Sequence, residues 1–105
     1  MKLEKSMKNF LIEWTPEAED WLDNQIFYLQ ENGFSHSLNV LAKDIDKKLK
    51  QLSKYPETGR TSISDPEIRF IKIGKNIELY YMFDGSIIQL LDFFDTRQNP
   101  TKRPF

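Results

Sequence analysis

Cysteine does not occur in this chain of 105 residues. Its absence excludes disulfide bonds and thiolate metal sites, and it fits a reducing compartment. The chain has a single histidine, His36, so it lacks a cluster of imidazole ligands. We therefore expect neither a transition-metal site nor any other cofactor. For His36 itself, a surface or capping position at the start of a helix is favoured over catalysis.

An excess of charge of one sign is also missing, because 15 basic residues face 16 acidic ones and the net charge is -1. Any binding of nucleic acid therefore has to rest on a local patch. No apolar run approaches the roughly 20 residues of a membrane span. The first ten residues, MKLEKSMKNF, lack the apolar region of a secretory signal. We expect a cytoplasmic protein without membrane contact.

The length predicts one domain over residues 1–105. Residues 1–8 are expected to form a mobile leader, with Met7 as an alternative start, and residues 101–105 a mobile tail. Phosphate-cradling loops, dinucleotide fingerprints and nucleophile elbows do not occur in the sequence.

Two amphipathic helices follow a short predicted strand at residues 10–14. Thr15 is an N-cap candidate before Pro16, and Asn32-Gly33 supplies a stop, which predicts a helix over residues 16–32. A second helix begins after a cap at Ser35 or Ser37. Its apolar positions recur at helical spacing: Leu38, Leu41, Ala42, Ile45, Leu49 and Leu52. The short link predicts an antiparallel helical hairpin.

The C-terminal part of the chain is rich in β-strand residues. A loop is expected over residues 55–66, then a strand over residues 68–73, a three-residue turn at residues 74–76, and two strands around Asp84-Gly85. Asp-Gly between apolar runs favours a type I′ turn with Tyr81 opposite Ile88 and Ile77 opposite Asp92. The order β-α-α-β-β-β predicts an α+β domain, with the helical hairpin packed on one face of an antiparallel sheet.

Alternation along the last two strands then assigns their two faces. The first face is apolar and needs a cover: Ile77, Leu79, Tyr81, Phe83, Ile88, Leu90 and Phe94. The second face mixes polar and apolar groups: Glu78, Tyr80, Met82, Ile87, Gln89, Leu91, Phe93, Asp95 and Arg97. The helical hairpin is the natural cover for the first face, so functional residues are expected on the second.

That second face carries the candidate catalytic residues. RNA cleavage by internal attack needs a base, an acid and cationic stabilisation of the phosphorane. Glu78 or Asp95 is a candidate base and Tyr80 a candidate acid, while Arg97 with Lys72 would stabilise the transition state. The alternative, which the residues themselves favour, is a Lys72–Glu78 cross-strand pair and an Asp95–Arg97 pair without chemistry.

Four segments resemble the RelE/ParE superfamily of bacterial toxins. They are WTPEAEDWL at residues 14–22, LSKYPETGR at 52–60, IRFIKIGKNIELYY at 68–81 and LDFFDTRQNP at 91–100. These toxins belong to type II toxin–antitoxin modules, which include plasmid stabilization systems. The resemblance implies two helices on one face of an antiparallel sheet, growth inhibition, and a cognate antitoxin that forms a hetero-oligomer with the toxin.

The resemblance also implies a choice of target. RelE-like members cleave messenger RNA on the ribosome without a metal, whereas ParE-like members inhibit DNA gyrase. Arg97 and Lys72 match two positions of the RelE-like site, but Glu78 stands where that site has an arginine. The segments LSKYPETGR and DTRQ resemble ParE-like chains more, so gyrase inhibition is favoured. RNA cleavage is the alternative, and a non-toxic homologue that binds an antitoxin is a second one.

Overall fold

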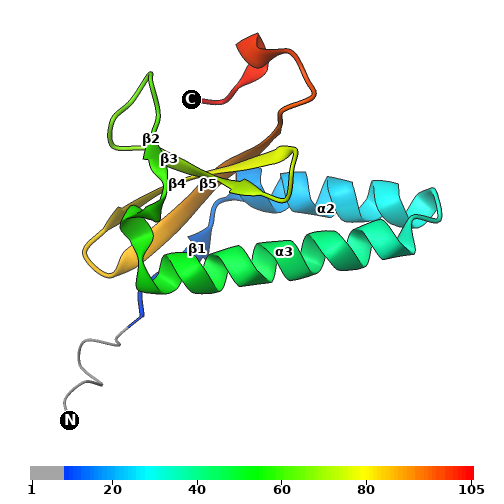
Figure 1. The fold of residues 1–105 in the computed structure, drawn as a ribbon, viewed down its shortest axis with the longest axis horizontal. Coiled ribbons are helices and arrows are strands. Elements are labelled where there is room, and N and C mark those ends of the chain that lie inside the picture. The colour runs from blue at the N-terminus through cyan, green and yellow to red at the C-terminus, as the bar shows by residue number, and fades with distance from the viewer. Residues whose placement is uncertain (1–8) are drawn as a thin grey trace.

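The computed structural model describes residues 9–105, and these form an α+β fold, as predicted. The predicted leader over residues 1–8, with the alternative start at Met7, lies outside the described residues. In chain order the elements are β1 (Leu11–Trp14), α2 (Pro16–Glu31), α3 (Ser35–Lys54), η1 (Pro56–Thr58), β2 (Arg60–Thr61), β3 (Arg69–Ile73), β4 (Ile77–Asp84), β5 (Ile87–Asp95) and η2 (Pro100–Lys102). Figure 1 shows both helices on one side of the sheet and the C-terminal segment on the other. Neither α2 nor α3 is long and apolar enough to cross a bilayer.

The sheet is mixed and has five strands in the order β1-β5-β4-β3-β2. β1 runs parallel to β5, whereas the other neighbours are antiparallel. The predicted fold class is confirmed, and the pairing within β2 to β5 is antiparallel as expected; only the edge strand β1 departs from the antiparallel prediction. The long connection from β1 through both helices and the rest of the sheet permits a parallel pairing with β5. The strand β2 was not predicted, because it lies within the loop expected over residues 55–66. It has only two residues, which is too few to show an alternation of apolar and polar side chains.

The two helices begin in different ways. The Thr15 side chain accepts a hydrogen bond from the backbone N–H of Ala18 at 3.3 Å, which confirms the predicted N-cap of α2. Phe34 holds the cap position of α3, and it has no side-chain cap bond. The expected serine cap was wrong because α3 already includes Ser35, with the Leu38 N–H bonded to the Phe34 carbonyl.

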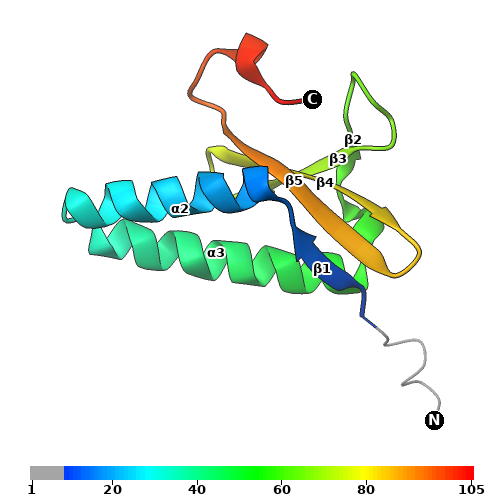
Figure 2. The same cartoon turned by 180° about the vertical axis from the view of Figure 1, so that it is seen from behind.

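The core lies between the helix pair and the sheet, and Figure 2 shows from behind how the two helices lie on one side of the strands. Its buried residues are Ala18, Ile45, Leu52, Ile71, Ile73, Leu79, Tyr81, Ile88, Leu90 and Phe93. Burial of each large aliphatic side chain contributes about 1.5–3 kcal/mol. We call the sheet surface against the helices the covered face and the opposite surface the open face.

The β4–β5 turn differs from the predicted one. Asp84 pairs with Ile87, so Gly85 and Ser86 are the two turn residues. Gly85 has a φ of 60°, and no non-glycine residue of the described chain has a positive φ. Glycine with positive φ at the first turn position is typical of a type II′ turn, so the type I′ prediction was wrong. Compared with the prediction, the pairing of β4 with β5 is shifted by two residues, and Ile88 lies opposite Phe83 instead of Tyr81. A shift by an even number keeps each side chain near the turn on its predicted face.

A β-bulge at Leu91 then reverses the faces of the rest of β5. Tyr81 pairs with Leu90 and Tyr80 with Asp92, which leaves Leu91 without a partner. One extra residue moves every later side chain to the other face. Phe93 therefore packs in the core and Phe94 lies on the open face, the reverse of the prediction. The reversal also affects the two candidate site residues that follow.

Candidate functional site

The open face holds a second, smaller hydrophobic cluster around a single carboxylate. Ile68, Tyr80 and Phe94 are buried there, with Phe70 and Leu91 packed against them. Tyr80 lies on this face and Tyr81 in the core, as the sequence predicted. Glu78 sits beside Tyr80 and is only 4% exposed. A charge buried this far needs hydrogen-bonding partners.

Glu78 is held by one phenol and one guanidinium. The Tyr80 hydroxyl donates to Glu78 Oε1 at 2.8 Å. Arg103 Nε donates to the same oxygen at 3.0 Å, and Arg103 Nη2 to Oε2 at 3.4 Å. The sequence did not predict Arg103, because it lies 25 residues further along the chain in a segment without periodicity.

These contacts determine the charge state of the pair. Burial raises the pKa of Glu78, but hydrogen bonds from Arg103 and Tyr80 and the charges of Arg103 and Lys72 leave it below its ordinary value. Burial and the adjacent carboxylate raise the pKa of Tyr80 to about 12. A general base or acid works best with a pKa near the operating pH. These shifts move the pKa values of both groups away from neutral pH.

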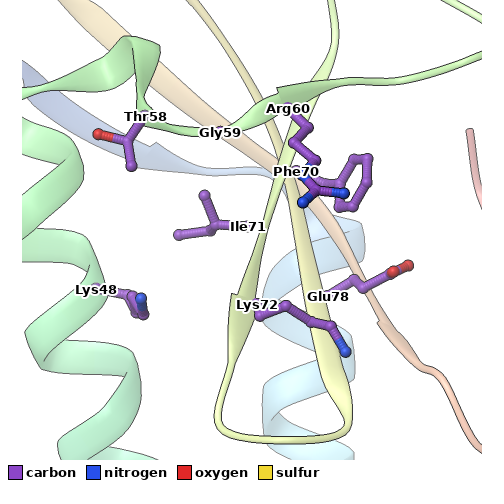
Figure 3. A pocket seen from close by; sticks show the side chains of 8 residues that line it. All are labelled: Lys48, Thr58, Gly59, Arg60, Phe70, Ile71, Lys72 and Glu78. Atoms are coloured by element: carbon purple, nitrogen blue, oxygen red, sulfur yellow. The ribbon is translucent and has the colours of Figure 1, made fainter.

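Lys72 lies directly opposite Glu78, as the three-residue turn at residues 74–76 predicted. Its Nζ donates to the Lys75 carbonyl at 3.2 Å, and its charge reaches Glu78 through space. Lys72 and Glu78 line a cavity of about 420 Å³ at the outer edge of β3. Figure 3 shows Phe70 and Arg60 above them and Lys48 of α3 on the far side of Ile71.

Asp95 and Arg97 lie on the covered face, away from the other three candidates. Asp95 pairs with Ile77, whereas Glu78 pairs with Phe94. Arg97 donates to Asp95 from Nη2 at 2.6 Å and from Nε at 2.9 Å, and these bonds lower the pKa of Asp95. The prediction that all five candidates share one face was therefore wrong: Lys72, Glu78 and Tyr80 come together, but the bulge at Leu91 turns Asp95 and Arg97 away. A catalytic role for these residues stays a prediction.

Arg97 lines a cleft of about 490 Å³ between the helix pair and the β3–β4 turn. Tyr28 of α2 and Phe34 between the helices contribute exposed rings to this cleft, and His36 lies at its wall. Residues 9–105 contain no group of three or more histidines and carboxylates that could hold a metal ion. The cleft combines exposed aromatic rings with the charged side chains of Arg97, Lys75 and Asp44.

Residues 12–100 match the family described as the ParE toxin of type II toxin–antitoxin system, parDE. The chain belongs to this toxin family. The prediction of a RelE/ParE toxin is confirmed, and its ParE branch is the one matched. No curated protein sequence matches the chain.

The fold of this ParE-family chain is also found in a solved structure. It is similar to the chromosomal ParDE TA system from P. aeruginosa, with a TM-score of 0.65 and 22% sequence identity. The match covers 86% of this chain and 97% of the other. At this level of identity the match concerns the arrangement of helices and strands. It supports the mixed sheet with a helical hairpin on one face.

For this ParE-family member, the buried Glu78 predicts a dependence of stability on pH. Its pKa in the folded state is lower than the ordinary value of 4.5, so its contribution is complete above that value and is lost as pH falls through the folded pKa. Glu78→Gln should lower the free energy of unfolding by about 1–3 kcal/mol at pH 7. The variant should also lose less stability than the parent protein between pH 5 and pH 3.

Urea denaturation at a series of pH values checks this expectation. Asp46→Asn is the matched control, because Asp46 forms an exposed pair with Lys50 on α3. Exposed pairs contribute roughly 0–1 kcal/mol, so this variant should follow the parent curve. Identical acid dependence in the parent protein and in Glu78→Gln would show that Glu78 does not titrate in this range.

Proposed function

We propose that this ParE-family protein is a growth-inhibiting toxin that acts on DNA gyrase and is neutralised by a cognate antitoxin. The family match over residues 12–100 carries the proposal. The separation of the candidate residues supports gyrase rather than RNA as the target. The RNA-cleaving alternative requires Arg97 beside the base and the acid, and Arg97 faces away from Glu78 and Tyr80. The cations near Glu78 are Lys72 and Arg103, and Arg103 is already bonded to the carboxylate.

The hydrogen bonds of Glu78 also support gyrase rather than RNA as the target. A base that abstracts the 2′-hydroxyl proton needs a free lone pair within reach of the substrate. Both oxygens of Glu78 accept bonds from Arg103, and one also accepts the Tyr80 hydroxyl. A binding role needs no free base, so gyrase inhibition by protein contact fits these residues better than catalysis.

The antitoxin is proposed as a segment that folds when it binds, giving a hetero-oligomer in the bacterial cytoplasm. The cleft beside Arg97 offers exposed Tyr28, Phe34 and Val40 on the tip of the helix pair. Exposed aromatic and aliphatic side chains around a cleft are typical of a surface for an amphipathic helix. A small reading frame next to this one, encoding a DNA-binding N-terminal half, is the expected source.

Induced expression of the protein tests the proposal. We expect growth arrest, a DNA-damage response and intact messenger RNA, and we expect co-expression of the neighbouring reading frame to restore growth. In a supercoiling assay the purified protein should inhibit gyrase. Primer extension on cellular messages distinguishes the alternative target. Discrete cuts within translated codons would identify a ribosome-dependent nuclease and contradict gyrase inhibition.

Two variants separate these outcomes further. Arg97→Ala should abolish cutting if the protein is a nuclease, whereas Lys50→Ala on the exposed face of α3 is the matched charge control. Normal growth of cells that contain the folded protein would contradict the toxin proposal. That outcome would identify a homologue that only binds its antitoxin.

A further inference from the structure

The C-terminal segment turns back and lies across the open face, on the side opposite the helices (Figures 1 and 2). Asn99 starts this turn, because its side chain accepts a hydrogen bond from the Thr101 N–H at 3.0 Å. The Arg103 N–H then donates to the Pro100 carbonyl at 3.1 Å. The sequence predicted a mobile tail over residues 101–105, and in the structure this segment contacts the sheet.

Two side chains of the segment contact the open face. Arg103 forms the hydrogen bonds to Glu78, and its guanidinium carbon lies 5.3 Å from the centre of the Phe94 ring. The Phe105 ring lies 5.7 Å from the Tyr80 ring. Lys102, next to Arg103, is exposed to solvent. The side-chain contacts of this segment with the open face are therefore made by an arginine and by an aromatic ring two residues later.

The open face has the complementary groups. Glu78 supplies a carboxylate at the bottom of an apolar surface, and the Tyr80 hydroxyl orients it. A guanidinium can satisfy both oxygens of a carboxylate and stack on an aromatic ring at the same time. If the tail left without a replacement, Glu78 would lose its cationic partner and the Tyr80–Phe94 surface would be uncovered.

We propose that the open face is a binding site for a peptide segment that carries arginine two residues before an aromatic residue. The protein's own tail fills this site in the free state, and a partner protein displaces the tail by presenting the same two side chains. We assign the antitoxin as the partner that carries this segment, and this assignment rests on the proposed function.

The tether sets the affinity that a partner needs. A segment joined by a short flexible link has an effective concentration on the order of millimolar. A partner segment replaces the tail when its concentration, divided by its dissociation constant, exceeds the effective concentration of the tail divided by the dissociation constant of the tail. A segment without a cation would leave the buried Glu78 without its ion-pair partner, with only the Tyr80 hydroxyl bonded to it, and this disfavours such a segment. The site thus selects its partner by charge as well as by shape.

Binding of a labelled peptide with the sequence of residues 98–105, QNPTKRPF, tests the proposal. Fluorescence anisotropy is measured against the whole protein and against an Arg103→Ala/Phe105→Ala variant, whose tail lacks both contacts. We expect the double variant to bind the peptide at least about tenfold more tightly, because its site is free. Addition of Glu78→Gln to that variant should weaken binding by a similar factor, as should arginine-to-alanine replacement in the peptide.

Lys102→Ala provides the matched control, since this lysine is adjacent to Arg103 but, unlike Arg103, forms no ion pair among the described residues. Its peptide binding should equal that of the parent protein. Circular dichroism confirms that each variant is folded, and a chain that ends at Asn99 repeats the test should the double variant unfold. Equal binding by the parent and the tail variants, or no binding to folded variants at millimolar peptide, would overturn the proposal. The measurement uses neither the antitoxin nor gyrase, so its failure is distinct from failure of the proposed function.

Discussion

Replacing Phe93 with alanine is expected to lower the free energy of unfolding by about 3–5 kcal/mol. Phe93 is 3% exposed, and its ring stacks on Trp21 with the centres 4.5 Å apart. Trp14 lies on it as well, at 5.9 Å. The variant would leave a cavity between two indole rings that are held by β1 and α2, so neither ring can close it easily. Urea denaturation followed by tryptophan fluorescence measures the loss.

Phe94→Ala is the matched control for this prediction. Phe94 is also almost buried, at 5% exposure, but it lies on the open face under Arg103. Its removal should destabilise the protein and leave the near-ultraviolet dichroism of the two tryptophans unchanged. The opposite result, with altered tryptophan signals only in Phe94→Ala, would mean that β5 has no bulge at Leu91.

Gly59→Ala is expected to have the second-largest effect, a loss of about 2–4 kcal/mol. A Cβ atom at this position would lie 2.5 Å from the Tyr81 hydroxyl and 2.9 Å from the Phe70 carbonyl oxygen. The Gly59 N–H donates to the Tyr81 hydroxyl, which donates in turn to the Pro56 carbonyl. Tyr81 is fully buried, so this hydroxyl cannot move into solvent.

A double-mutant cycle with Tyr81→Phe tests the cause of that loss. Tyr81→Phe removes the atom nearest to the added Cβ. It should therefore lower the free energy of unfolding less in the Gly59→Ala background than in the parent protein. Recovery will be partial because the Phe70 carbonyl stays close. Additive effects, measured by thermal or urea denaturation, would show that the contact with Tyr81 is not the reason.

The sequence predicted the two helices and most of the strand faces correctly, because periodicity is a local property. Leu79, Tyr81, Ile88 and Leu90, which were assigned to the apolar face, are all buried in the core. The three-residue turn also placed Lys72 opposite Glu78. These results follow from the spacing of apolar residues and from turn geometry, both of which act over a few positions.

The candidate site was only partly predictable. A bulge is one unpaired residue, and nothing in the composition of LLDFF distinguishes Leu91 from its neighbours. Asp95 and Arg97 were therefore assigned to the wrong face, although their mutual ion pair was anticipated. Arg103 has no partner within its own segment, and only the docking of the tail brings it to Glu78.

By itself the sequence determined that this protein is an α+β member of the ParE toxin family, with a helical hairpin over one sheet face. Apolar spacing, helix caps and turn residues act between positions that are close in the chain, so they can be recognised in the amino-acid sequence. The tertiary structure alone decided that Glu78 binds Arg103 and that Arg97 stays on the other side. Those two facts depend on one unpaired leucine and on contacts between distant segments, whose free energies arise only when the sheet and the tail are assembled.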